Sequence, residues 1–189
     1  MPDLLLESAR LNLRPVHDED LDDLHQCFVH PEVRRYLLDD EIIGVDQVAG
    51  LIGQSERSFQ REGYGFYGLR LRESDFHDRQ GLIGFCGCRP ADFADGLELL
   101  FGLYPEYWGK GLGSEAARKV LGHLFENTDI EQIYATTDTP NQRSVRVLQR
   151  LGMCFDRRCE LRGLDTVFYS MSRQDYLYHL GARRRISNA

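Results

Sequence analysis

Leu-Leu-Phe-Gly-Leu-Tyr-Pro-Glu-Tyr-Trp-Gly-Lys-Gly-Leu-Gly-Ser, residues 99–114, is the stretch that decides the fold. Its apolar run 99–103 is short and ends before Pro105, which predicts a buried strand followed by a loop. Three glycines alternate directly before a helical pattern, at positions 109, 111 and 113. Because glycine has no Cβ, this backbone can lie flat against a ligand, and the helix start adds unpaired N–H groups and a positive dipole end. We therefore expect a site for a phosphate or diphosphate at this turn.

Strand and helix patterns continue on both sides of this stretch. Before it, we expect a strand over 5–14, a helix capped by Asp18 and a turn or short helix over 31–37. A helix should follow from Asp46 to about Arg61. We then expect strands over 65–71 and 81–88, joined by a hairpin loop at 72–80, and a loop over 91–96. After it, we expect a helix from Ser114 to about Asn127, a strand over 133–137, a short helix capped by Asn141 and ended by Gly152, and a strand pair over 153–162 and 166–172. This order predicts an α/β sandwich around a mixed sheet.

The composition is that of a soluble globular domain. With 189 residues, 42 % of them hydrophobic, the chain suits one core, and we place a single domain at 1–180 and a flexible tail at 181–189. No apolar run approaches the roughly 18 residues of a membrane helix and no signal peptide is evident, so we expect a cytoplasmic protein without a membrane partner. The net charge of −7 argues against a nucleic-acid partner. The five cysteines and six histidines show no metal-ligand spacing, so we expect no metal.

Three blocks of the sequence together resemble the GNAT (Gcn5-related) N-acetyltransferase superfamily. Pro105 to Gly113 is similar to its acetyl-CoA motif Gln/Arg-x-x-Gly-x-Gly/Ala, with Trp108 in the first position as in the RimJ/RimL-like branch. Asn141-x-x-Ser144 and the following residues 151–153 resemble the next block, and residues 7–21 resemble the N-terminus of that branch. The resemblance implies a mixed, mostly antiparallel sheet of about seven strands, flanked by helices and splayed centrally for acetyl-CoA.

The resemblance also implies how acetyl-CoA is bound. Backbone N–H groups at the glycine turn would hold the diphosphate, and unpaired backbone groups of the central strand would bind the pantetheine arm as an added strand. The residues that we expect to bind the cofactor are Phe101, Gly102, Leu103, Trp108, Gly109, Lys110, Gly111, Leu112, Gly113, Ser114 and Asn141.

Two residues are candidates for catalysis by the same resemblance. Glu98, at the start of the central strand, is the candidate base that takes a proton from the amine, directly or through water, with Glu160 and Asp165 as alternatives. Ser144 is the candidate donor to the departing thiolate. Many relatives use a tyrosine for that purpose, but its position here holds Leu148.

We expect an N-acetyltransferase in which a primary amine attacks acetyl-CoA directly within a ternary complex. The amine is a small molecule or a protein N-terminus, and a homodimer is left open. An alternative is a non-catalytic acyl-CoA-binding or regulatory module on the same fold. A second alternative is a dinucleotide-binding oxidoreductase, because Gly111-x-Gly113-x-x-Ala116 fits a short dinucleotide fingerprint.

Overall fold

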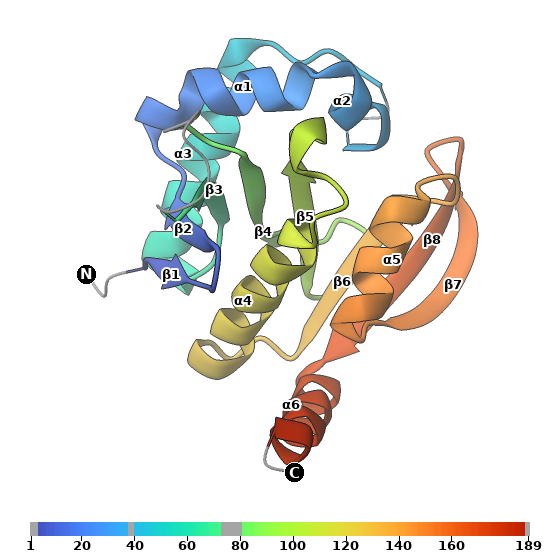
Figure 1. Ribbon diagram of the computed structural model, residues 1–189. Helices are drawn as coiled ribbons and strands as arrows, with labels where there is room; N and C mark the ends of the chain where they lie inside the picture. Colours follow the sequence, from blue (N-terminus) through green and yellow to red (C-terminus); the bar gives the residue numbers. More distant parts are fainter. Residues whose placement is uncertain (1–3, 38–39, 73–80, 188–189) are drawn as a thin grey trace.

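The computed structural model describes residues 4–37, 40–72 and 81–187, with side chains up to residue 181. The strands in this part of the chain are β1 (Leu6–Glu7), β2 (Leu11–Pro15), β3 (Phe66–Leu71), β4 (Gly84–Pro90), β5 (Leu97–Leu103), β6 (Gln132–Asp138), β7 (Cys154–Leu161) and β8 (Leu164–Ser172). The α-helices are α1 (Leu21–Val29), α2 (Pro31–Leu37), α3 (Val45–Glu62), α4 (Leu112–Asn127), α5 (Gln142–Leu151) and α6 (Arg173–Ser187), as Figure 1 shows.

The described strands form one mixed sheet. Their order is β1-β2-β3-β4-β5-β6-β8-β7, and every neighbouring pair is antiparallel except β5 and β6. This confirms the mixed, mostly antiparallel sheet flanked by helices. A dinucleotide fold needs a mostly parallel, doubly wound sheet, so that alternative is wrong.

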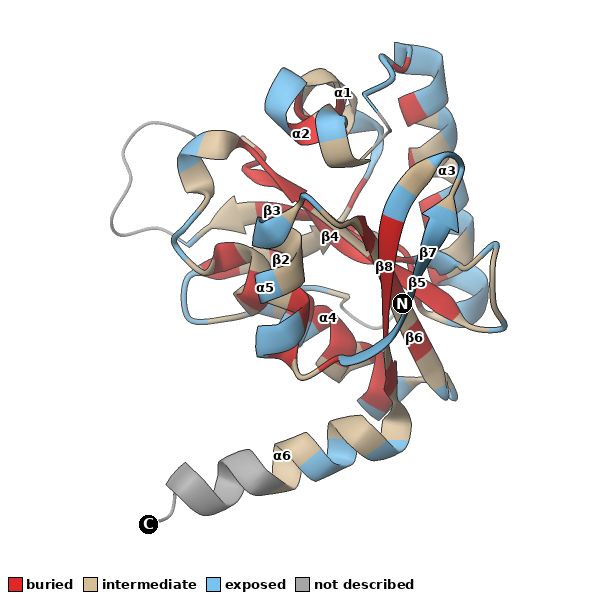
Figure 2. Ribbon diagram, turned by 90° about the vertical axis from the view of Figure 1, so that its right-hand side faces the viewer, coloured by how far each residue is buried: buried red, intermediate tan, exposed pale blue. Residues whose placement is uncertain are grey.

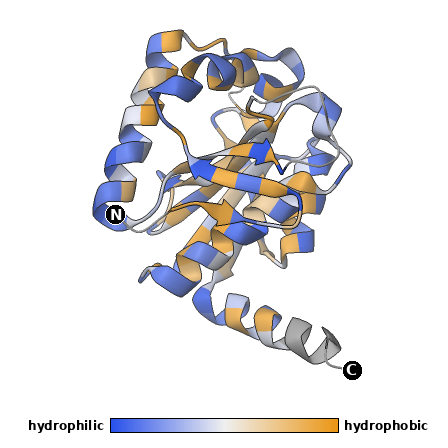
Figure 3. Ribbon diagram, turned by 60° about the vertical axis from the view of Figure 1, so that its left-hand side comes forward, coloured by the Kyte–Doolittle hydropathy of each residue, from blue (hydrophilic) through white to orange (hydrophobic). Residues whose placement is uncertain are grey.

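Two apolar cores lie on opposite faces of the sheet. One packs α4 and α5 against the strands and contains Leu121, whereas the other packs α1, α2 and part of α3 and contains Ile52. Phe85 and Cys86 are neighbours on β4 and belong to different cores, as the two-residue period of a strand requires. The central strands are buried in Figure 2 and mainly hydrophobic in Figure 3, while the edge strand β7 is exposed along most of its length.

The first expected strand is in fact two strands. Over 5–14 the chain forms β1 and β2, which fold back on each other with Leu6 opposite Leu13. Ser8 closes the turn, because its hydroxyl accepts from the Leu11 N–H at 3.0 Å and its own N–H donates to the Leu11 carbonyl at 2.9 Å. The apolar alternation continues through this turn, so the pattern alone does not reveal it.

Two helices begin earlier than expected. α3 follows the N-cap Gly44, so Asp46 lies in its first turn and does not cap it. α4 begins at Leu112, after the N-cap Gly111 and before the expected start at Ser114. The earlier start of α4 matters for function, because it places the glycine turn directly at the N-terminal end of this helix.

An unpredicted helix, α6, follows β8 and leads away from the sheet (Figures 1 and 2). It begins with a capping box in which the Ser172 N–H donates to Asp175 Oδ2 at 2.9 Å and the Asp175 N–H donates to Ser172 Oγ at 3.1 Å. Residues 181–187 of the expected tail belong to this helix, and the flexibility of that tail stays a prediction. Most of the expected hairpin loop over 72–80 lies outside the described residues.

β5 and β6 lie side by side only at their start. Their parallel register pairs Leu97 with Ile133 and Glu98 with Tyr134, although both strands continue well beyond these pairs. The two strands therefore separate after Glu98, which confirms the expected central splay. Within the part of the chain that the structure describes, one edge of β5 has no strand partner from there to its end.

Candidate active site

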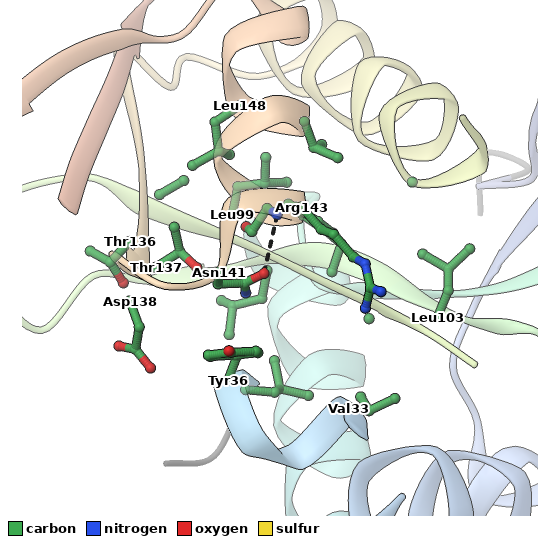
Figure 4. Close-up of a pocket in the computed structure, with 18 of the residues that line it drawn as sticks. Val33, Tyr36, Leu99, Leu103, Thr136, Thr137, Asp138, Asn141, Arg143 and Leu148 are labelled. Carbon is green, nitrogen blue, oxygen red and sulfur yellow. Dashed lines mark hydrogen bonds between the residues drawn. The ribbon is translucent and has the colours of Figure 1, made fainter. Parts of the chain in front are cut away.

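A cavity of about 1070 Å³ opens where β5 and β6 part. Its walls come from α2, β5, the glycine turn, the end of β6, α5 and the β7–β8 turn. In Figure 4, Val33 and Tyr36 rise from α2 on one side, and Asn141 and Leu148 lie on the opposite wall. Of the thirteen residues expected in catalysis or cofactor binding, all except Lys110 line this cavity.

The glycine turn forms a cradle at the N-terminus of α4. Gly109 and Gly111 have φ values of +72° and +78°, in the left-handed region that disfavours other residues. Gly113 lies beside β5, because a Cβ there would be 3.4 Å from Leu103 Cδ1. Ser114 is only 7 % exposed, and its hydroxyl has no hydrogen-bond partner among the described residues. A buried, unpartnered hydroxyl beside free helix N–H groups fits an anionic group such as a diphosphate.

Contacts from the turn between β1 and β2 hold this cradle in place. Arg10 binds Glu115 in the first turn of α4 through Nε at 2.8 Å and Nη2 at 2.6 Å, and its Nη1 donates to the Lys110 carbonyl at 2.9 Å. Ser8 Oγ also donates to Glu115 at 2.7 Å. Burial alone would raise the pKa of Glu115, but the hydrogen bonds from Ser8 and Arg10 lower it below its ordinary value. The charge of Glu115 is thus compensated by Arg10, next to the place where an anion would bind.

The open edge of β5 presents backbone groups of alternate residues. The Tyr104 N–H donates to the Ile83 carbonyl next to β4 at 3.0 Å. Because backbone groups alternate along a strand, those of Phe101 and Leu103 face the splay and those of Gly102 face β4. Gly102 therefore lines the cavity without offering it the unpaired backbone groups that we expected.

The aromatic loop before the glycines packs onto this edge. Trp108 Nε1 donates to the Leu103 carbonyl at 2.7 Å, and the Arg143 guanidinium lies 4.5 Å from the centre of the Trp108 ring. Figure 4 shows Arg143 reaching from α5 toward Leu103. The Lys110 ammonium instead lies 5.5 Å from the Tyr107 ring centre, outside the cavity wall. Arg143 therefore places a positive charge on this wall, which Lys110 does not line, and the expected role of Lys110 in cofactor binding stays a prediction.

Glu98 is buried where β5 and β6 part. Its Oε2 atom accepts hydrogen bonds from Arg89 Nε at 3.2 Å and from Arg89 Nη2 at 3.0 Å. Its Oε1 atom accepts a hydrogen bond from Thr136 Oγ1 at 2.8 Å. These contacts join β4, β5 and β6 at one point. Each carboxylate oxygen has two lone pairs, so Glu98 retains capacity for a further donor from the cavity.

The two alternative bases are placed elsewhere. Neither Glu160 nor Asp165 lines the cavity. Arg158 binds Asp165 in a paired geometry at 2.7 and 2.5 Å, and this hydrogen bonding lowers the pKa of the Asp165 carboxyl. Of the three expected carboxylates, Glu98 is therefore the best placed to take a proton from a ligand in the cavity.

Asn141 and Ser144 lie together at the start of α5. Asn141 Oδ1 accepts from the Ser144 N–H at 3.2 Å, which confirms Asn141 as the N-cap (dashed line in Figure 4). No hydrogen bond ties the Ser144 hydroxyl to a described residue, so it can turn toward a ligand. Leu148, one turn further on, is fully buried and takes no part in proton transfer.

Some cavity residues were not predicted from the sequence. Tyr36 on α2 and Asp138 at the end of β6 reach the cavity from elements whose relative position depends on the tertiary fold. Arg143, Arg146 and Arg150 on α5 also line it, and their spacing of three and four residues could have revealed a common helix face. Among the described residues, no group of three or more His, Cys, Asp or Glu side chains is placed to hold a metal ion. None of the described helices has the length and apolar character needed to span a bilayer.

Comparison with known proteins gives consistent matches. Residues 10–154 match the family described as "Acetyltransferase (GNAT) domain". The chain is 28 % identical over 179 residues to "Uncharacterized N-acetyltransferase p20" of Bacillus licheniformis, covering 90 % of this chain and 97 % of that protein. It is 24 % identical over 147 residues to the spermidine N(1)-acetyltransferase of Escherichia coli K12, covering 75 % and 72 %. The solved structure of RimL, a ribosomal L7/L12 alpha-N-protein acetyltransferase in complex with coenzyme A, superposes with a TM-score of 0.71 at 18 % identity, covering 89 % of this chain and 97 % of that one.

Proposed function

The chain belongs to the GNAT acetyltransferase family, and on that premise we propose that it transfers the acetyl group of acetyl-CoA to a primary amine. The observation that carries this proposal is the continuity of the cavity, which joins the cradle at α4, the open edge of β5 and the Glu98 carboxylate. A diphosphate, an extended amide-containing arm and a thioester would need these three environments in this order.

Binding relies mainly on the backbone. The N–H groups of the cradle and the Ser114 hydroxyl hold the diphosphate, and Arg143 adds positive charge beside them. The pantetheine amides pair with the Phe101 carbonyl and with the Leu103 N–H, which face the splay. Asn141 contributes its amide NH₂ group from the opposite wall, because its Oδ1 is already used as the helix cap.

In the reaction, the amine nitrogen forms a bond to the acetyl carbonyl carbon, the carbon–sulfur bond breaks, and CoA leaves as the thiolate. Glu98 takes the proton that the nitrogen loses, directly or through water. The backbone N–H of Phe101 on the open edge stabilises the charge that develops on the carbonyl oxygen. The Ser144 hydroxyl donates a hydrogen bond to the departing sulfur.

A panel of amines tests this proposal. We expect the protein to release free CoA thiol from acetyl-CoA only when an amine is present, with one acetylated amine formed per thiol. The panel contains spermidine, lysine and short peptides with free N-termini, because the relatives above act on acceptors of both kinds. Thiol release without an acetylated product, or no turnover with any of these amines, contradicts the proposal.

A non-catalytic acyl-CoA-binding module remains the second candidate, favoured by two observations. The tyrosine position of many relatives is occupied by the buried Leu148, and the Glu98 carboxylate is already bound to Arg89 and Thr136. Such a module would bind CoA tightly and transfer no acetyl group. Calorimetric CoA binding together with the amine panel therefore separates the two candidates.

Replacing Ser144 with alanine is expected to lower kcat by ~10-fold or more, because a hydrogen bond to a charged group contributes about 1.5–3 kcal/mol. CoA affinity should stay within about two-fold, since the Asn141 cap uses the Ser144 backbone N–H and not its hydroxyl. Steady-state kinetics and CoA titration of Ser144→Ala measure the two effects. Ser58→Ala on α3, outside the cavity wall, is the matched control. An unchanged kcat removes Ser144 from the mechanism.

A further inference from the structure

Three arginines form a row along one face of α5. Arg143, Arg146 and Arg150 are three and four residues apart, so they lie on one helix stripe about 10 Å long. All three are exposed and all three line the cavity. In a chain with a formal net charge of −7, this is a local concentration of positive charge on the wall of the candidate active site.

These arginines differ from most others in the described part of the chain. Ten arginines there are paired with carboxylates: Arg10, Arg14, Arg34, Arg70, Arg72, Arg89, Arg157, Arg158, Arg162 and Arg173. None of the three on α5 is paired with a described carboxylate. Three neighbouring cations repel one another unless an anion lies among them. The row is therefore best explained as a site for an anion that the chain itself does not supply.

The row begins at the cradle and leads away from it. Arg143 packs over Trp108, directly before the glycine turn. At the far end, the Arg150 carbonyl accepts from Arg118 Nη2 at 3.5 Å, and Arg118 lies one turn beyond Ser114 on α4. The row thus follows the seam between α4 and α5. A ligand whose diphosphate lies in the cradle would place its next substituents along this seam.

CoA carries one further anionic group, the phosphomonoester on the 3′ position of its ribose. Resting on the proposed function, we propose that Arg146 and Arg150, assisted by Arg143, form a second anion subsite that binds this 3′-phosphomonoester. Guanidinium groups match phosphate oxygens with paired N–H donors. A phosphomonoester places three free oxygens and nearly two negative charges on a single phosphorus, which suits a compact group of guanidiniums. The subsite makes the protein select CoA over analogues that lack this phosphate.

Isothermal titration calorimetry with CoA and with 3′-dephospho-CoA tests the inference without any variant. We expect the unmodified protein to bind CoA about 10-fold or more tightly than 3′-dephospho-CoA, because one or two charge-assisted hydrogen bonds distinguish the ligands. The preference should shrink as salt is raised from about 0.05 to 0.5 M, since exposed charges are screened. Inorganic phosphate at millimolar concentration should compete weakly with CoA and hardly at all with 3′-dephospho-CoA.

A double variant locates the subsite. In Arg146→Gln/Arg150→Gln, CoA affinity should fall by ~10-fold or more to the level of 3′-dephospho-CoA, whose own affinity should change by less than about two-fold. The matched control is Arg57→Gln/Arg61→Gln, which removes two exposed arginines with the same four-residue spacing on α3, outside the cavity. The control should keep the full preference for CoA.

The outcomes separate this inference from the proposed function. Equal affinity of the unmodified protein for the two ligands overturns the inference and leaves the proposed function standing. An equal loss of affinity for CoA and 3′-dephospho-CoA in the double variant also overturns it, because the arginines would then bind the diphosphate or stabilise the fold. If neither ligand binds the unmodified protein, the proposed function and the inference fall together.

Discussion

Gly113→Val is expected to weaken CoA binding by ~10²- to 10⁴-fold. The Cβ at this position would point at Leu103 and Phe101, with Leu103 Cδ1 at 3.4 Å and Phe101 Cδ2 at 3.9 Å. The methyl groups of valine would therefore fill the gap between the start of α4 and the open edge of β5. Loss of two charge-assisted hydrogen bonds, each contributing about 1.5–3 kcal/mol, corresponds to the expected range. Calorimetry or fluorescence titration with CoA measures it.

The control for Gly113→Val is Gly50→Val on α3. Gly50 is also a helical glycine, but nothing lies within 4 Å of its Cβ position and it is outside the cavity. Gly50→Val should change helix stability through the helix propensity of valine and leave CoA affinity unchanged. Gly113→Ala adds a graded variant, because its Cβ makes only ordinary contacts and the fold should persist. A folded Gly113→Val protein with CoA affinity within a few-fold of the unmodified chain would refute the assignment of the cradle.

The local features of this site could be predicted from the sequence. The glycine turn, the strand before it and the Asn141 cap each depend on residues close together in the chain, and all three are present. The separation of β5 and β6 could be predicted only from the family resemblance, because no residue pattern in either strand indicates where their pairing ends. Local chemistry therefore predicted the pieces, and the resemblance predicted how they are joined.

Features that depend on distant contacts could not be predicted. Glu98 is bound by Thr136, which is 38 residues away, and the cradle is held by Arg10, about 100 residues before it. The backbone direction of Gly102 depends on its pairing with β4, which the strand pattern does not contain. The arginine row on α5 is visible in the sequence, but only the packing of that helix shows that it faces the cavity.

Glu98→Gln is expected to lower kcat by ~10²-fold or more with CoA affinity unchanged, because a positioned general base typically contributes about 10²- to 10⁴-fold. Glutamine keeps the size of the side chain and can still accept from Thr136, but it cannot take a proton. Arg89 loses its ion-pair partner, yet its side chain is 44 % exposed, so solvent limits the cost to about 1 kcal/mol of stability. Kinetics and thermal unfolding of the same variant measure both effects.

The pH dependence separates a base from a structural carboxylate at Glu98. A peptide α-amine has a pKa of about 7.7–8.0, so above about pH 9 it is already deprotonated and needs no base. If Glu98 is the base, the deficit of Glu98→Gln should shrink as pH rises from about 7 to 9.5 with a peptide acceptor. It should persist with lysine, whose amine has a pKa of about 10.4.

The companion variant Arg89→Gln keeps the carboxylate and removes only the ion pair that Glu98 makes with β4. If Glu98 is the base, Arg89→Gln should retain most of the kcat. If the Glu98 carboxylate only joins the strands, kcat should fall as much in Arg89→Gln as in Glu98→Gln. A loss of kcat that is the same in both variants and independent of pH would therefore show that Glu98 serves to join the strands of the sheet and is not the base. Proton removal would then belong to water in the cavity, and the acceptors would be restricted to amines that are largely neutral at the working pH.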